Sequence, residues 1–254
     1  MAQGWFEHVS ASLQICLCFA MRAVVIGATS SVGHALVEAL ARSDAWTSIC
    51  IVVRKPTDDF AKIVGSEKVT TKVLADLDNL QSLAWELEGY DAMFCSLGAY
   101  LKMDGPELVE KVDFTYVVAA ATLAEQCKIA SFSLVSAGGA NADLPEDSKG
   151  FMLYLRTKGR AERAVLEKAI ARIYVYRPGI LFGRHSTQAT GSTRSKGSWD
   201  TFVACLNCCC CCLVASTGVH IKALAQVMVA RAERAEDAVK ATIDNDEIHK
   251  LYAE

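Results

Sequence analysis

The sequence predicts one α/β domain built on a doubly wound, mostly parallel sheet. Short apolar runs alternate with amphipathic segments along the chain, and a turn bracketed by glycines joins the first run to the first such segment. The length of 254 residues and the hydrophobic content of 52% are enough to bury one full core, and no linker-like tract divides the chain. We therefore expect a single domain over residues 21–254.

Residues 21–33, MRAVVIGATSSVG, begin the predicted sheet. The apolar run at 23–26 is typical of a buried strand, and an amphipathic helix is expected over 31–42. Gly27 and Gly33 bracket the tight turn between them. Such a turn lets backbone N–H groups and the positive end of a helix face a pyrophosphate. The stretch therefore predicts a Rossmann-like domain that binds a dinucleotide.

Ser30 departs from this pattern, because dinucleotide-binding turns usually carry a middle glycine at its position. Its hydroxymethyl group occupies space where close backbone approach is wanted, whereas its hydroxyl is able to donate to a phosphate oxygen. The turn alone therefore leaves an alternative open. In that alternative the domain has kept its fold and lost its cofactor.

A basic pair follows the second predicted strand, 48–53. Arg54 and Lys55 stand where an acidic residue would accept a hydrogen bond from the ribose of NAD. A basic pair there would instead bind a 2′-phosphate, which NADP(H) carries and NAD(H) lacks. The pair predicts NADP(H) as the cofactor. The alternative is that both charges are ordinary solvated loop residues.

Two further strands and one helix are expected in the next part of the chain. The segments 72–74 and 92–96 are predicted strands, and the leucine spacing over 79–87 is helical. Leu97 and Gly98 follow the second of these strands. They are expected at the carboxyl edge of the sheet, where ligands bind in open parallel sheets.

The residues that carry chemistry come after a long predicted helix, 106–127, and a predicted strand, 131–135. Ser136 stands at the carboxyl end of that strand. Tyr154 and Lys158 lie four residues apart on the next predicted helix, so they share one of its faces.

Tyr154 and Lys158 suit the reduction of a carbonyl group. A hydride that arrives at a carbonyl carbon leaves an alkoxide that needs a proton, and a phenol is a reluctant donor at neutral pH unless a nearby ammonium stabilises the phenolate. Lys158 supplies that charge and would also hold the nicotinamide ribose, while the hydroxyl of Ser136 would orient the substrate oxygen. Alone, a Tyr-x-x-x-Lys spacing is also common in surface pairs on helices.

The C-terminal part of the chain completes the predicted sheet. A sixth strand is expected over 171–176, and Pro178 turns the chain out of the ladder. The polar run 185–198 is either a substrate lid or a loose loop. A helix is expected over 219–230, before a charged tail.

Residues 1–20 contain no Lys or Arg and have an apolar second half. They lack the basic region of a secretion signal and the arginines of a transit peptide, and their apolar part is too short to span a bilayer. We expect a non-native or disordered extension, a cytoplasmic location and no membrane span. The net charge of −3 predicts no nucleic-acid partner.

Eleven cysteines include a run of five at 208–212. Adjacent side chains point in different directions, so the run is unsuited to a tetrahedral metal, and CxxC spacing is absent. We expect no metal site. The run is interpreted as an apolar stretch of reduced thiols, with S-acylation or redox sensitivity as alternatives.

Seven short motifs resemble the atypical short-chain dehydrogenase/reductase superfamily and, within it, the HIV Tat-interacting-protein oxidoreductase family. They extend from the first strand to the C-terminus in the family's order, which is more specific than any single motif. They are GATSSVG at 27–33, VVRKP at 52–56, CSLGAY at 95–100, SLVSAGGAN at 133–141, YLRTKG at 154–159, RPGIL at 177–181 and EIHKL at 247–251.

The resemblance implies a Rossmann sheet, NADPH as cofactor and a tyrosine proton donor. It places that donor at Tyr154, with Lys158 as its electrostatic partner. An acidic insertion at 141–147 and an unmatched segment at 185–217 depart from the family pattern and leave the substrate unidentified. The cofactor contacts that it implies are Thr29, Ser30, Ser31, Val32, Arg54, Lys55, Leu97, Gly98 and Leu181.

The function predicted from these residues is NADPH-dependent reduction of a small-molecule carbonyl substrate. The resemblance implies one alternative, an NADPH-binding regulatory or scaffold protein that binds a protein partner without significant catalysis. A fold resemblance defines the cofactor better than it defines the chemistry, so both interpretations stand at this point.

Overall fold

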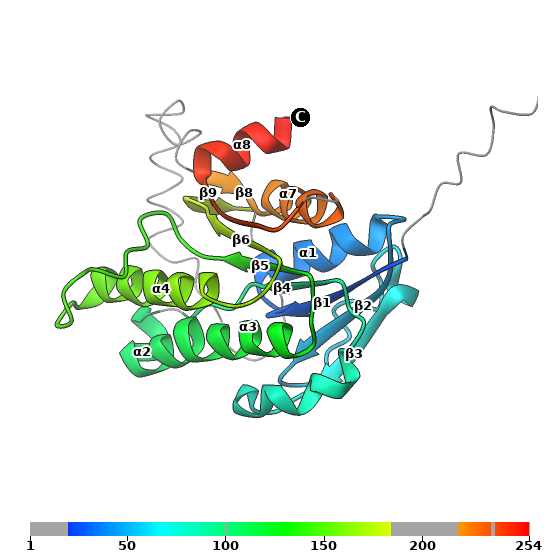
Figure 1. Ribbon diagram of the computed structural model, residues 1–254, viewed down its shortest axis with the longest axis horizontal. Coiled ribbons are helices and arrows are strands. Elements are labelled where there is room, and N and C mark those ends of the chain that lie inside the picture. Colours follow the sequence, from blue (N-terminus) through cyan, green and yellow to red (C-terminus); the bar gives the residue numbers. More distant parts are fainter. Residues whose placement is uncertain (1–19, 100, 184–217, 235–236, 254) are drawn as a thin grey trace, which may run out of the picture.

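The computed structural model describes residues 20–99, 101–183, 218–234 and 237–253 (Figure 1). Three expectations fall wholly or almost wholly outside the described residues. They concern the extension at 1–20, the polar run at 185–198 and the cysteine run at 208–212.

Seven parallel strands form one sheet in the order β3-β2-β1-β4-β5-β6-β9, which confirms the predicted fold class. The chain reverses its direction of travel across the sheet between β1 and β4, and ligands of doubly wound folds bind at such a switch point. The strands are β1 Met21–Ile26, β2 Trp46–Val53, β3 Val69–Val73, β4 Ala92–Cys95, β5 Ser131–Val135, β6 Arg172–Arg177 and β9 Val239–Asp244. Two short strands, β7 Ile180–Phe182 and β8 Gly218–His220, pair separately.

Helices cover both faces of the sheet, with α1, α7 and α8 on one side and α2, α3 and α4 on the other (Figure 1). The α-helices are α1 Ser31–Arg42, α2 Leu101–Glu110, α3 Tyr116–Gln126, α4 Gly150–Leu166, α7 Ile221–Glu233 and α8 Asn245–Ala253. Shorter turns of helix are the 3₁₀ segments η1 Ser66–Lys68 and η2 Leu77–Glu86 and the π-helical turn η3 Lys111–Thr115.

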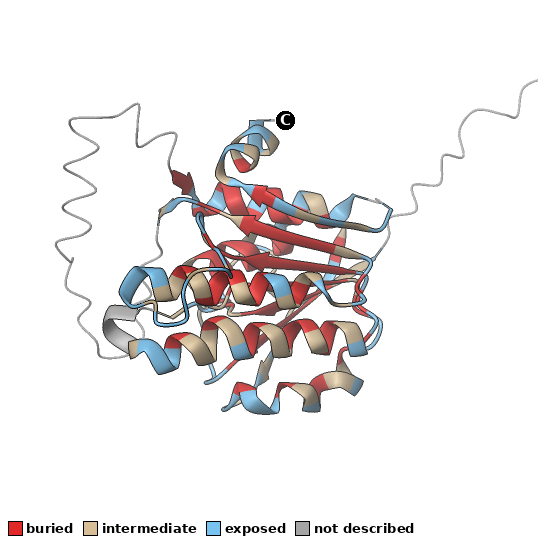
Figure 2. Ribbon diagram, turned by 60° about the vertical axis from the view of Figure 1, so that its left-hand side comes forward, coloured by how far each residue is buried: buried red, intermediate tan, exposed pale blue. Residues whose placement is uncertain are grey.

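The central strands are buried on both faces, as Figure 2 shows, because each alternates its side chains between two cores. In β1, Ala23 and Val25 pack under α1 and α7, whereas Val24 and Ile26 pack under α3 and α4. This double burial explains why the central strands have continuous apolar sequences.

The edge strands are less apolar, and this limited their prediction. Strand β9, with the sequence VKATID, was not predicted, because its exposed residues interrupt the apolar run. Strand β3 begins three residues before the predicted segment 72–74, and most of its side chains are exposed or half-buried.

Three helical predictions need correction. The segment 106–127 is divided by the π-helical turn η3, and Gly105, which has φ +78°, breaks the helix just before it. The segment 79–87 lies largely in the 3₁₀ helix η2, with a kink at Asn79. The start of 219–230 belongs to β8, and α7 begins only after His220, whose Nδ1 accepts the Lys222 N–H at 3.2 Å.

Gly33 allows the first turn of α1 to lie directly on the end of β1. A Cβ atom at this position would lie 2.1 Å from the carbonyl oxygen of Gly27 and 2.8 Å from Cα of Ala28. Gly27 has φ +86°, and a Cβ atom there would lie 2.9 Å from the backbone of Ser96 at the end of β4. The two glycines therefore fix the distance between the turn, the helix and the sheet edge.

We expect Gly33→Ala to lower the free energy of unfolding by about 3 kcal/mol, because its methyl group would overlap backbone atoms that have no room to move. Urea denaturation measures the loss. Gly98→Ala is the matched control, since the nearest atom to its added Cβ lies 3.7 Å away. Equal stability of Gly33→Ala and the parent would contradict this account of the turn.

Candidate functional site

The turn between β1 and α1 is closed by the side chain of Ser30. This residue is the N-cap of α1, and its Oγ accepts the N–H of Gly33 at 2.9 Å. The same hydroxyl lies 3.2 Å from the Oγ of Ser96, which in turn donates to the carbonyl oxygen of Gly27 at 3.1 Å. Ser30 thus fits its position by binding inward to the helix and to β4.

The start of α1 keeps backbone donors available. Ser31 and Val32 occupy its first two positions, and no acceptor for their N–H groups occurs among the hydrogen bonds of the described residues. Thr29 is exposed on the turn before them. Free N–H groups at a helix start, beside a glycine with positive φ, have the chemistry that a pyrophosphate requires. The residues present therefore fit a dinucleotide.

Arg54 and Lys55 follow β2 at the same carboxyl edge of the sheet. Both side chains are exposed, and neither forms a hydrogen bond or ion pair with any residue in the part of the chain that the structure describes. Their charges are therefore available to an anionic ligand at this edge.

A buried ion pair joins α4 to the π-helical turn η3, and both partners bind the loop after β4. The Nζ atom of Lys158 lies 2.7 Å from Oδ1 of Asp113, and both side chains are almost completely buried. Lys158 also donates to the carbonyl oxygen of Leu97 at 3.2 Å, and Asp113 accepts the N–H of Ala99 at 2.9 Å. The pair therefore holds the loop that contains Leu97 and Gly98 against α4.

The charge of Lys158 is stabilised in this dry environment. Burial acts to lower its pKa, but the negative charge of Asp113 and the neighbouring Tyr154 outweigh burial, so the pKa lies above the usual value of 10.5. The ammonium lies 6.0 Å from the centroid of the Tyr154 ring. Tyr154 and Lys158 are thus adjacent, as their spacing predicted.

Ser136 belongs to a second buried polar cluster. Its hydroxyl donates to the carboxylate of Glu162, and Glu162 also pairs with Arg177, whose Nε lies 3.0 Å from Oε1. Hydrogen bonding to Glu162 raises the pKa of Arg177 further above its usual value. A hydroxyl has a single proton, so donation from Ser136 to a substrate oxygen would require the bond to Glu162 to break.

The structure brings together most of the predicted site residues, but not all of them. Gly27, Ser96 and Leu97 lie close together, and Leu97 binds Lys158. Leu181 lies on β7, opposite Val219, and packs against the core beneath α1 and α7; none of the hydrogen bonds that Lys158 forms among the described residues reaches it.

Asp113 and Glu162 were missed by the sequence prediction. Glu162 lies four residues after Lys158 and eight after Tyr154, so the repeated spacing of four already placed all three on one face of α4. Asp113 follows Glu110 and Lys111 at the start of a mostly apolar run, so little in the sequence separates it from its charged neighbours.

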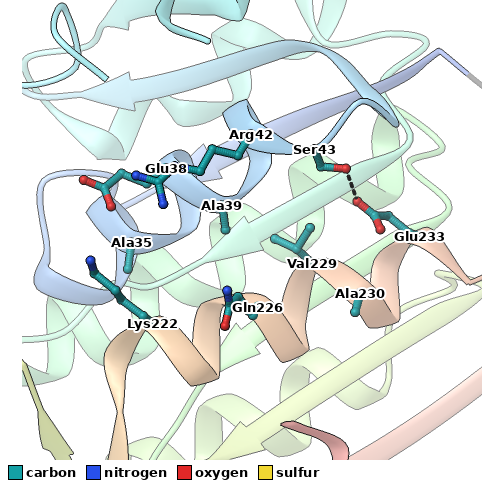
Figure 3. Close-up of a pocket in the computed structure, with 10 residues that line it drawn as sticks. All are labelled: Ala35, Glu38, Ala39, Arg42, Ser43, Lys222, Gln226, Val229, Ala230 and Glu233. Atoms are coloured by element: carbon teal, nitrogen blue, oxygen red, sulfur yellow. Dashed lines mark hydrogen bonds between the residues drawn. The ribbon is translucent and has the colours of Figure 1, made fainter. Parts of the chain in front are cut away.

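The groove in Figure 3 lies elsewhere, between α1 and α7. Its volume is about 200 Å³. Ser43 and Glu233 close one end through a hydrogen bond of 2.7 Å. None of the predicted cofactor or catalytic residues lines the groove.

A family model described as NAD(P)H-binding matches residues 27–200, which is more than half of the chain. The chain belongs to this NAD(P)H-binding family. Within the family, it is 28% identical over 160 residues to Protein HTATIP2 of Rattus norvegicus, covering 62% of this chain and 61% of the relative. That relative confirms the resemblance drawn from the motifs.

A second relative is Protein FMP52-2, mitochondrial, of Scheffersomyces stipitis, which is 32% identical over 163 residues, covering 63% of this chain and 66% of the relative. The chain thus matches less than two thirds of the length of either relative. FMP52 proteins of Debaryomyces hansenii, Meyerozyma guilliermondii, Candida albicans and Eremothecium gossypii are also named mitochondrial. These names contradict the expected cytoplasmic location.

The fold of the NAD(P)H-binding family is also evident in solved structures. A Bacillus halodurans protein provisionally assigned as an NAD-dependent epimerase/dehydratase matches with a TM-score of 0.64 at 18% identity, over 92% of this chain and 99% of that chain. In the described ranges of our chain, no helix is long and apolar enough to cross a membrane. Those ranges also contain no group of three or more metal-binding side chains.

We expect the Asp113–Lys158 pair to show strong coupling in a double-mutant cycle. Asp113→Asn and Lys158→Met each leave one buried charge without its partner and should each cost about 3 to 5 kcal/mol, whereas the double variant should cost less than their sum. The pKa of Lys158 is raised, so its contribution is complete below pH 10.5 and is lost only as the pH rises through the folded value. Urea denaturation at pH 7 therefore measures the coupling free energy while Lys158 is charged.

The exposed pair Arg163–Asp143 is the matched control for this cycle. Its two side chains are 57% and 78% exposed, so its coupling should stay below about 1 kcal/mol. Equal coupling in the buried and exposed pairs would contradict the assignment of Lys158 as a desolvated charge.

Proposed function

We propose that the chain is an NADPH-dependent reductase of carbonyl compounds. The observation that supports this most is the placement of Tyr154 beside the buried ammonium of Lys158, which also binds the loop at the sheet's switch point. A phenol next to a charged amine in a nucleotide-binding domain has the chemistry of a proton donor for reduction.

NADPH, when bound, supplies the hydride. Tyr154 donates its phenolic proton to the oxygen of the carbonyl group, and Lys158 stabilises the phenolate that remains. Because its pKa is raised, Lys158 keeps its charge throughout the neutral range. Tyr154 then recovers a proton from solvent. Ser136 donates its proton to Glu162 and holds the end of β5, so it would orient the substrate oxygen only after that hydrogen bond breaks.

Ser31 and Val32 would bind the pyrophosphate through their free N–H groups, while Arg54 and Lys55 would bind the 2′-phosphate. Two exposed cations at the end of β2 favour NADPH over NADH, since NADH has no phosphate there. The capped, inward-facing Ser30 leaves the outer side of the turn available to the cofactor.

We expect tight binding of NADPH and weaker binding of NADH in a fluorescence titration of the full chain. Arg54→Ala should weaken NADPH binding by about tenfold to a hundredfold and leave the affinity for NADH unchanged, because only NADPH loses a charge-assisted contact. Lys62→Ala, which removes another exposed cation, is the control. Equal affinity for both cofactors would refute the NADPH preference.

We expect Tyr154→Phe to lower kcat by about 10² to 10⁴ and to leave the affinity for NADPH nearly unchanged, since it removes only the proton donor. The loss of NADPH absorbance in the presence of aldehydes measures turnover. Tyr252→Phe, on the exposed face of α8, is the matched control. Undiminished turnover by Tyr154→Phe would refute the assigned role. Binding of NADPH without turnover of any carbonyl would favour the regulatory alternative.

A further inference from the structure

We propose, on the basis of the reductase function above, that the substrate is a flat, apolar and uncharged carbonyl compound, held against the ring of Phe151. A carbonyl that accepts a proton from Tyr154 must lie within hydrogen-bonding distance of its phenol. The rest of the substrate therefore lies over the residues that adjoin Tyr154, and their chemistry indicates its class.

Phe151 adjoins Tyr154 directly. It lies three residues earlier on α4, and the two rings are stacked with centroids 6.0 Å apart and an angle of 25° between their planes. Its side chain is nevertheless 67% exposed, and the next residue, Met152, is 46% exposed. Leu108, on the neighbouring helix α2, is a third exposed apolar side chain. Water-exposed apolar groups beside a proton donor favour an apolar ligand.

Two exposed glycines, Gly138 and Gly139, lie in the loop after β5 that contacts α4. Gly139 is close to Leu155, the residue after Tyr154, since a Cβ on Gly139 would lie 3.7 Å from Cδ1 of Leu155. Gly138 donates its N–H to the carbonyl oxygen of Pro178 at 2.8 Å. Two residues further along the chain, Ile180 is 37% exposed. Exposed glycines leave this part of the loop without side chains that would obstruct a planar group near α4.

The charges around α4 argue against an anionic substrate. Among the described residues, each arginine around α4 already has a carboxylate partner, so none of these offers a free guanidinium to a carboxylate or phosphate. The pairs are Arg156 with Glu146, Arg160 with Glu110, Arg163 with Asp143 and Arg177 with Glu162. Lys158 is buried and paired with Asp113, so its ammonium is not exposed to an anionic group on a substrate. Lys149, which precedes α4, is an exposed cation that could still bind an anionic substrate, so the experiment includes an anionic aldehyde.

The experiment measures how fast the NADPH-loaded full chain reduces each of three aldehydes. They are naphthaldehyde (the 2-isomer), which is flat and apolar, carboxybenzaldehyde (the 4-isomer), which is anionic, and glyceraldehyde, which is small and polar. In each reaction the carbonyl carbon gains a hydride from NADPH, the C=O π bond breaks, and the oxygen gains a proton, which gives an alcohol and NADP⁺. We expect kcat/KM to be at least about tenfold higher for naphthaldehyde than for the other two.

Phe151→Ala should weaken the apparent binding of naphthaldehyde and raise its KM by about tenfold, clearly more than it raises the KM of glyceraldehyde, and should leave the affinity for NADPH unchanged. Phe151→Tyr should restore the parent KM, because it restores the ring. Trp85→Ala removes an aromatic side chain that is 75% exposed on η2, so it is the matched control and should change nothing.

Binding of naphthalenemethanol, the alcohol that reduction of naphthaldehyde would give, in the presence of NADP⁺ separates this inference from the reductase function. Phe151-dependent binding of naphthalenemethanol without turnover of any aldehyde would support the apolar surface and refute the reductase function. Turnover of glyceraldehyde or carboxybenzaldehyde in preference to naphthaldehyde would support the reductase function and overturn this inference. An unchanged KM for naphthaldehyde in Phe151→Ala would overturn it as well.

Discussion

The buried ion pair between Lys158 and Asp113 is the constraint on which the rest of the site depends. An ammonium and a carboxylate at 2.7 Å, both out of contact with water, are stable only while each keeps its partner and its backbone hydrogen bonds. These bonds attach α4 and η3 to the loop after β4. The position of Tyr154 relative to the sheet edge therefore depends on charges at the bottom of the site.

A similar arrangement recurs one turn further along α4. Glu162 links the helix to the ends of β5 and β6 through Ser136 and Arg177. Both clusters bring opposite charges together, so the interior of this edge is close to electrically neutral. Arg54 and Lys55, which have no described partner, lie on the surface instead. The molecule thus separates charges that hold the structure from charges that are available to a ligand.

Local sequence patterns were sufficient for the central strands, the glycine turn and the Tyr154–Lys158 pair, because each depends on residues close together in the chain. They were insufficient for β9, whose alternating exposed residues reflect its place at the sheet edge. The hydroxyl of Ser136 was expected to face a substrate, yet its partner Glu162 lies 26 residues away. Which residue of another element a side chain binds depends on tertiary packing, and a local sequence pattern carries no information about it.

The π-helical turn η3 contains Asp113, and it lies between the α-helices α2 and α3. Such a turn is one residue longer than the α-helical turn it replaces. Deleting one residue would rotate everything on one side of it by about 100° relative to the other. Asp113 could then no longer face Lys158 while α3 stayed packed on the sheet. The extra residue in η3 is therefore what allows the charge pair to form. A chain that lacked this residue would keep the same nucleotide-binding fold but would lose the pair.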